Sequence, residues 1–331
     1  MPKFTGIEYV RCNLCGDDNT RLLFKLPVRP QHIGVFNRDE WDIVRCQECG
    51  LIYENPRADT IARDYYYTFD NAGDYAFVQD WFLDNADLNR LTCKQILRAI
   101  LHYCQGGNLL DVGCGTGNFL TEARKAGFDV SGQDVSPYFI NYCRTHYDFP
   151  VYDSELETLG LPEASFDCVT SFDVIEHVRY PKQLLKEMRR LVRPGGLVVV
   201  GTHDIGNIFA RLYGVEWRHM GAMGHITYFT RQTLSRMMNE CSLDIVQHSG
   251  GHTVDGNKLA ELRNYVTKFI RVVVLRSIIL WIYKPITEHC PPLTHWGIRL
   301  GEATINHQKL LMRAGKQVVM NDNIILLALA K

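Results

Sequence analysis

The segment spanning residues 106–120 constrains the fold more than any other part of the chain. Two glycines precede the apolar run Asn108–Val112, which continues into Gly113-Cys-Gly115-Thr-Gly117 and then into residues typical of a helix start. Glycines permit a tight turn and a close approach of the backbone to a ligand, and N–H groups at a helix start favour an anionic group. The segment therefore predicts a strand, a ligand-binding turn and a helix of an α/β sheet.

The glycine spacing separates this turn from the dinucleotide-binding motif. The order is G-x-G-x-G rather than G-x-G-x-x-G, and Asp111 precedes the first glycine by two residues. A second predicted strand ends at Asp134, twenty-one residues after Gly113. A carboxylate at that position can accept hydrogen bonds from both ribose hydroxyls. We therefore expect a nucleoside-containing ligand other than a nicotinamide cofactor.

The sequence D-V-G-C-G-T-G, followed by G-Q-D-V-S-P, resembles the first two motifs of class I S-adenosylmethionine (SAM)-dependent methyltransferases. The resemblance continues through residues 166–178 and 191–200, and it covers roughly residues 107–250 together with the last strand, 323–330. It implies a Rossmann-like, seven-stranded α/β sheet, SAM as the cofactor and methyl transfer as the reaction.

The same resemblance implies where SAM is held. The glycine turn and the first aspartate would hold the methionine end, and Asp134 would hold the ribose. The loop after the third strand, around Glu155 and Leu156, would cover the adenine, and Phe172 would line the methionine arm. The residues expected at the methionine end are Asp111, Gly113, Gly115 and Gly117.

Two C-x-x-C pairs near the N-terminus, each followed by glycine, have the spacing of a zinc ribbon. Thirty residues separate the pairs. Four thiolates can surround a d10 metal ion tetrahedrally, and such a closed shell leaves no position for substrate. We expect a structural zinc ion; the alternative is two unligated pairs. The expected ligands are Cys12, Cys15, Cys46 and Cys49.

The candidate catalytic residues follow the fourth predicted strand and a later glycine-rich loop. Asp173, Glu176 and His177 come directly after a strand of the sheet, at the rim where open α/β sheets bind ligands. His225 lies in Met-Gly-His-Ile-Thr-Tyr, before a predicted helix. In a metal-free hypothesis His177 or His225 is a general base, and the plainest alternative has both histidines fixing loops.

The same four residues also resemble the divalent-metal site of small-RNA 2′-O-methyltransferases and of some ubiquinone-pathway O-methyltransferases. Asp173 stands where those groups carry glutamate, and its side chain is shorter. The resemblance implies a second metal site for Mg²⁺ or Mn²⁺, formed by Asp173, Glu176, His177 and His225. The nearby His203 and His219 make this set less distinctive.

The sequence predicts three parts: a zinc ribbon (1–57), a helical linker or lid (58–106) and a SAM-dependent methyltransferase domain (107–331). The last part carries a helical insertion at about 257–313, before the final strand. Residues 251–313 hold nine Lys/Arg against four Asp/Glu beside apolar helix faces, as expected for a lipid surface or a phosphorylated substrate; the alternative is that these faces pack in a dimer or in the core. The N-terminus lacks the features of a secretory signal, so we expect a cytoplasmic protein, with peripheral contact to the inner face of the membrane left open.

The net charge of −1 argues against a nucleic-acid partner, which normally requires a basic face. The expected function is transfer of a methyl group from SAM to a small-molecule hydroxyl, on a sugar, a lipid-linked intermediate or a secondary metabolite. Two alternatives stay open: methylation of an RNA 2′-hydroxyl or base, and a SAM-binding scaffold without catalysis.

Overall fold

The structure is a computed structural model that describes residues 6–28, 38–61, 86–217, 219–221, 224–249 and 323–331. Contacts divide the chain into two compact units, and every described residue belongs to the unit made of 1–250 and 322–331. The predicted helical insertion at 257–313 lies outside the described residues, as does much of the predicted linker (62–85). None of the described helices combines the length and the hydropathy that a bilayer crossing requires.

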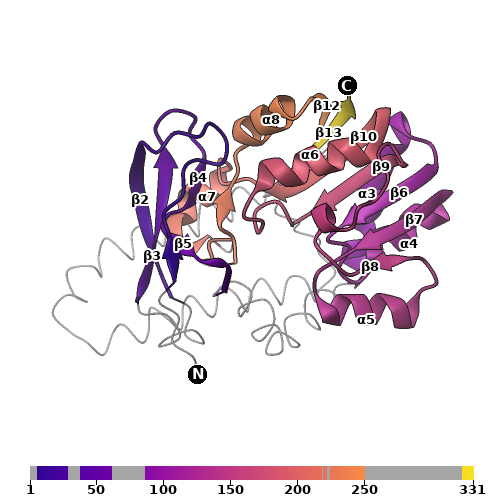
Figure 1. The fold of residues 1–331 in the computed structure, drawn as a ribbon, viewed down its shortest axis with the longest axis horizontal. Helices are drawn as coiled ribbons and strands as arrows, with labels where there is room; N and C mark the ends of the chain where they lie inside the picture. The colour runs from indigo at the N-terminus through magenta and orange to yellow at the C-terminus, as the bar shows by residue number, and fades with distance from the viewer. Residues whose placement is uncertain (1–5, 29–37, 62–85, 218, 222–223, 250–322) are drawn as a thin grey trace, which may run out of the picture. The chain divides into compact units, whose positions relative to one another are not determined.

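A seven-stranded sheet forms the centre of this unit, with the order β12-β13-β10-β9-β6-β7-β8 (Figure 1). Strands β10, β9, β6, β7 and β8 are mutually parallel, and β13 runs antiparallel between β10 and β12. The prediction of a seven-stranded Rossmann-like sheet is confirmed. The strands are β6 (Gly107–Val112), β7 (Phe128–Gln133), β8 (Val151–Tyr152), β9 (Phe166–Phe172), β10 (Val192–His203), β12 (Leu243–Ser249) and β13 (Asn323–Ala330).

Helices cover both faces of the sheet, because neighbouring strand residues point to opposite sides. Leu109 packs in a core with α3, α4 and α5, whereas Leu110 packs in a second core with α6 and α8. The helices are α3 (Ala86–Tyr103), α4 (Asn118–Lys125), α5 (Pro137–His146), α6 (Pro181–Leu191), α7 (Ile208–Tyr213) and α8 (Arg231–Glu240), with short 3₁₀ turns η4 (Leu156–Thr158) and η5 (Gly214–Glu216).

The N-terminal residues form a small antiparallel sheet with the order β11-β4-β3-β2. Three of its strands come from the N-terminal segment, but β11 comes from the loop between α7 and α8, far along the chain. The strands are β2 (Thr20–Pro27), β3 (Glu40–Cys46), β4 (Ile52–Glu54) and β11 (Thr227–Tyr228); a separate pair is formed by β1 (Ile7–Glu8) and β5 (Arg57–Ala58).

Candidate functional site

The glycine turn connects β6 to α4 at the edge formed by the carboxyl ends of the parallel strands. Gly113, Gly115 and Gly117 have φ angles of 73°, 53° and 73°, which favour glycine. A Cβ atom on Gly113 would lie 2.2 Å from Cγ2 of Val174. The strand order reverses between β6 and β9, and ligands of open α/β sheets bind at such a switch point. The turn therefore lies where this fold places a ligand.

Asp134 follows β7 and contacts the glycine turn directly. Its Oδ2 accepts a hydrogen bond from the Gly115 N–H (2.9 Å) and its Oδ1 accepts one from the Ser136 N–H (2.8 Å). Burial raises the pKa of this carboxyl, although these backbone donors oppose the shift. The structure thus brings the predicted ribose acid to the predicted cofactor turn.

Gln133 joins the ends of three strands around this turn. Its backbone oxygen accepts from the Gly113 N–H (2.7 Å) and its side-chain Nε2 donates to the Ser154 carbonyl (2.7 Å). Sequence reasoning did not single out Gln133, because an amide next to a recognised acid carries no distinctive signal of its own. Its role in the turn becomes visible only in the contacts.

Asp111 lies inside the sheet, close below the turn. The side chain is 3% exposed, and Oδ1 accepts a hydrogen bond from the Thr170 hydroxyl (2.6 Å). Burial raises the pKa of Asp111 to about 7, with a further contribution from Asp134, and the Thr170 hydrogen bond opposes the rise. The carboxyl therefore titrates near neutral pH in the ligand-free protein.

The remaining predicted cofactor residues occupy different environments. Phe172, at the end of β9, packs edge-to-face on Phe119 with ring centroids 5.0 Å apart. Glu155 is exposed immediately before η4, whereas Leu156 is 2% exposed and packs in the core. Only Glu155 of this pair thus presents its side chain to solvent.

The predicted catalytic residues gather at the carboxyl ends of β9 and β10. Asp173 is largely exposed and has a positive φ of 56°. Glu176 is 2% exposed, and within the described residues neither of its carboxylate oxygens makes a hydrogen bond of good geometry, although the Thr202 side chain lies close enough to lower its pKa. The rings of His177 and His225 meet edge-to-face at 4.6 Å. The structure therefore brings the predicted residues together from two distant loops.

His203 belongs to the same cluster although it was not in the predicted set. Its Nε2 lies 3.7 Å from Oε1 of Glu176 and 3.8 Å from Oδ1 of Asp173. One donor atom each from Glu176, His203 and His225 lies within 4.8 Å of the others. His219 stacks on His203 with a centroid separation of 3.5 Å. His203 is the last residue of β10. This position was the signal available in the sequence, because the carboxyl ends of parallel strands lie at one edge of a sheet.

Backbone and amide oxygens fix the orientation of these imidazole rings. Nδ1 of His225 donates to the His219 carbonyl (2.8 Å), and Nδ1 of His203 donates to Oδ1 of Asn323 (2.8 Å). His177 likewise donates from Nδ1 to the Gly224 carbonyl (2.7 Å). A histidine held at Nδ1 keeps the lone pair of its neutral form on Nε2, as metal-binding and basic histidines require.

The electrostatics of the cluster favour a bound cation or proton. Burial, reinforced by Asp173, raises the pKa of Glu176 to about 8. Burial, reinforced by His177 and His203, holds the pKa of His225 well below its usual range. A buried carboxylate beside neutral imidazoles is stabilised by a positive charge between them. The donor set of Glu176, His203 and His225 therefore fits a divalent ion.

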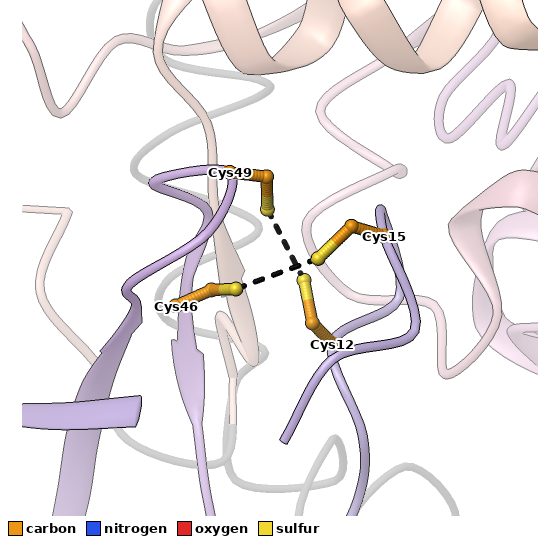
Figure 2. A group of neighbouring side chains, drawn as sticks. All are labelled: Cys12, Cys15, Cys46 and Cys49. Carbon is orange, nitrogen blue, oxygen red and sulfur yellow. Dashed lines mark hydrogen bonds between the residues drawn. The ribbon is translucent and has the colours of Figure 1, made fainter. Parts of the chain in front are cut away.

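Four cysteines from two tight turns point toward a common centre (Figure 2). Sγ of Cys12 lies 3.4 Å from that of Cys49, and Sγ of Cys15 lies 3.5 Å from that of Cys46. A tetrahedron with zinc–sulfur bonds of about 2.3 Å has edges of about 3.8 Å. The predicted cysteines thus form one cluster of the size that a zinc ion requires.

Cationic side chains line a cavity beside this cysteine cluster. The cavity, of about 710 Å³, is lined by Cys12, Cys15, the two carboxylates Glu8 and Glu240, and four cationic side chains. Burial raises the pKa of Cys12 to about 11, so four thiolates need a compensating positive charge. A zinc ion bound by four thiolates would carry a net charge of −2, which these cations would help to stabilise. These cations are Arg11, Arg57, Lys182 and Arg236.

Comparison with known proteins agrees with the fold and the cofactor turn. Residues 85–248 match the family model described as a methyltransferase domain. Residues 85–248 are therefore a SAM-dependent methyltransferase domain.

Similar proteins share only part of the chain. A ubiquinone biosynthesis O-methyltransferase of Cereibacter sphaeroides is 30% identical over 157 residues, which are 44% of this chain and 64% of that protein. The mitochondrial ubiquinone biosynthesis O-methyltransferase of Arabidopsis thaliana is 26% identical, over 44% of this chain and 49% of that protein. This chain thus spans less than two thirds of the length of these relatives. A solved SAM-dependent methyltransferase of Mesorhizobium loti aligns with a TM-score of 0.43 and 18% identity, covering 71% of this chain and 96% of that one.

Proposed function

We propose that this protein transfers a methyl group from SAM to a hydroxyl oxygen of a small molecule. The observation that carries the proposal is the buried Glu176 carboxylate, whose Oε1 lies 3.7 Å from Nε2 of His203. The cluster adjoins the cofactor turn, because Val174 contacts Gly113. The similarity to ubiquinone biosynthesis O-methyltransferases supports a small-molecule oxygen as acceptor.

In this reaction the acceptor oxygen attacks the methyl carbon of SAM. The carbon–sulfur bond breaks, its electron pair stays on sulfur, and S-adenosylhomocysteine leaves while the hydroxyl proton passes to a base. The protein must align the oxygen with the carbon–sulfur bond and assist deprotonation. His225 is one candidate base, because the His219 carbonyl holds its Nδ1 and leaves the lone pair of the neutral ring on Nε2, although burial lowers its affinity for a proton. His177, whose ring adjoins that of His225, is the other candidate base.

A divalent ion at the same place would assist differently. Glu176, His203 and His225 would hold it, with Asp173 close to His203, and it would lower the pKa of an acceptor hydroxyl bound to it. This ligand set differs from the one that the resemblance implied, because it includes His203 and leaves out His177. Two imidazoles favour Mn²⁺ over Mg²⁺.

Mass spectrometry with methyl-deuterated SAM tests the proposal. We expect the purified protein to label a small molecule in metabolite extracts, to lose this activity in EDTA and to recover more of it with Mn²⁺ than with Mg²⁺. Zinc content after EDTA treatment, measured by elemental analysis, controls for loss of metal from the cysteine cluster. Labelling that persists in EDTA assigns deprotonation to a histidine base alone. Label in added RNA, or no label in any acceptor despite SAM binding, would contradict the proposed function.

The titration of Asp111 predicts a pH dependence of SAM binding. The cationic amino group of SAM would pair with the ionised Asp111 carboxylate, and this carboxyl is mostly protonated below a pH of about 7. The Kd for SAM is therefore expected to fall roughly tenfold as the pH rises from about 6 to about 8. Calorimetric titration at several pH values measures this. In D111N the Kd should be higher and this pH dependence absent; an equal dependence in D111N would remove Asp111 from the explanation.

A further inference from the structure

We propose that the cysteine ribbon, residues 6–58, is a structural part of the acceptor site and positions the two loops that carry Glu176 and His225. Its metal would then be required for an ordered acceptor site but not for SAM binding. The inference rests on the proposed function only in calling the Glu176 cluster an acceptor site; the contacts themselves stand apart from it.

The loop that carries His225 is held through the small sheet. Strand β4 of the ribbon pairs with β11, and the Glu54 N–H donates to the Ile226 carbonyl (3.0 Å). On the other side, the N–H groups of Ile226 and Thr227 both donate to the Glu176 carbonyl, at 3.0 and 3.1 Å. The residues directly after His225 are therefore hydrogen-bonded both to the ribbon and to the loop that carries Glu176.

The loop that carries Glu176 is held at Arg179, three residues after Glu176. The carbonyl of Arg179 accepts hydrogen bonds from Asn13 Nδ2 (3.1 Å) and from Arg57 (2.9 Å). The Arg179 guanidinium in turn donates to the Ala58 carbonyl (3.0 Å) and pairs with Glu8. Arg57 and Arg179 are both buried, so these charged hydrogen bonds are shielded from water and costly to leave unmade.

Apolar packing joins the ribbon to the same loops. Leu51 and Tyr53, which follow the second cysteine pair, lie in one core with Ile175 and Phe229. Cys12 and Cys46 belong to this core as well. The core shared with the ribbon also includes Leu110 and Val112 of β6, but the core on the other face of the sheet, which contains Cys114 of the glycine turn and residues of α4, includes none of the described ribbon residues. Loss of ribbon structure should therefore disorder the acceptor loops first, while the glycine turn and α4 keep their structure.

The ribbon depends on its metal because of its size. A segment of about fifty residues buries little apolar surface of its own, so bound zinc would supply much of its folding free energy. Without the metal the cysteine turns open, and the anchors at Asn13 and Glu54 lose their fixed positions. The Ile226 and Thr227 amides are then held from the Glu176 side only.

Hydrogen exchange on the full chain, followed by mass spectrometry, tests the inference. We compare C46S, which removes a metal ligand, with C93S, the same substitution on α3 outside the cluster. In C46S the amides of 173–180 and 224–230 should exchange at least about tenfold faster. The amides of 107–134 should stay protected, and the Kd for SAM should stay within about twofold of wild type, since each 1.4 kcal/mol would change it tenfold. C93S should match wild type.

A second variant keeps the metal and removes the anchors. N13A/R57M deletes both hydrogen bonds to the Arg179 carbonyl, so zinc content should stay at one per chain while 173–180 exchanges faster. Unchanged protection of both loops in C46S would overturn the inference. It would also be overturned if C46S lost SAM binding and its amides lost protection throughout the chain. Faster exchange of the two loops in a protein that binds SAM but methylates nothing would uphold the positioning role and refute the proposed function alone.

Discussion

Replacing Glu176 by glutamine is expected to lower the turnover of methyl transfer by about 10³-fold while SAM binding is unchanged. Glutamine keeps the shape of the side chain but removes the negative charge that holds either a divalent ion or a protonated base. Losing a general base or its electrostatic support costs about 10²–10⁴ in rate. The glutamate lies at the acceptor edge and does not contact the glycine turn, so the Kd for SAM should not move.

The stability of this variant separates a catalytic from a structural role. Burial raises the pKa of Glu176 to about 8, so the native state holds this carboxylate at a cost. E176Q should therefore melt at the same temperature as wild type or higher. Steady-state kinetics, calorimetry with SAM and thermal unfolding measure the three quantities, and E163Q, at an exposed glutamate, is the matched control. Wild-type turnover in E176Q would place the acceptor chemistry elsewhere.

Replacing Asp134 by alanine is expected to weaken SAM binding by at least about 100-fold. Two hydrogen bonds from ribose hydroxyls to a carboxylate contribute about 1.5–3 kcal/mol each. The substitution also removes the acceptor for the Gly115 and Ser136 N–H groups, which shape the turn. Because the acceptor cluster is intact, turnover at saturating SAM should fall far less than affinity.

Calorimetric titration of SAM into D134A measures this effect, with D153A as the control. Asp153 is an exposed carboxylate that pairs with Arg144 rather than with the turn. A Kd for SAM in D134A within a few-fold of wild type would show that the ribose is bound elsewhere. An equal loss in D153A would indicate a general effect of charge instead of a ribose contact.

The sheet and the cofactor turn could be predicted because local signals specify them. Each parallel strand is followed directly by glycine or an acid, and the predicted strand 323–330 coincides with β13. The spacing from Gly113 to Asp134 follows from one strand–helix–strand unit, so the contact between Gly115 and Asp134 was within reach of the sequence. The cysteine cluster could be predicted because two C-x-x-C pairs at this spacing are typical of a zinc ribbon.

The acceptor cluster could be predicted only in part. Glu176, His177 and His225 carry a recognisable pattern, but which histidine faces Glu176 depends on distant acceptors such as the Asn323 side chain. The pairing of β11 with the ribbon was missed, because a two-residue strand has no periodicity to detect. These features depend on contacts between segments far apart in the chain, which no local pattern encodes.

A crystal structure with S-adenosylhomocysteine tests the central claim most directly. The account predicts the ribose hydroxyls on Asp134, the amino group near Asp111 and the glycine turn, and the sulfur atom facing the cluster of Glu176, His203 and His225. A product bound with its sulfur directed away from these residues, or bound outside the carboxyl ends of β6 and β7, would contradict it.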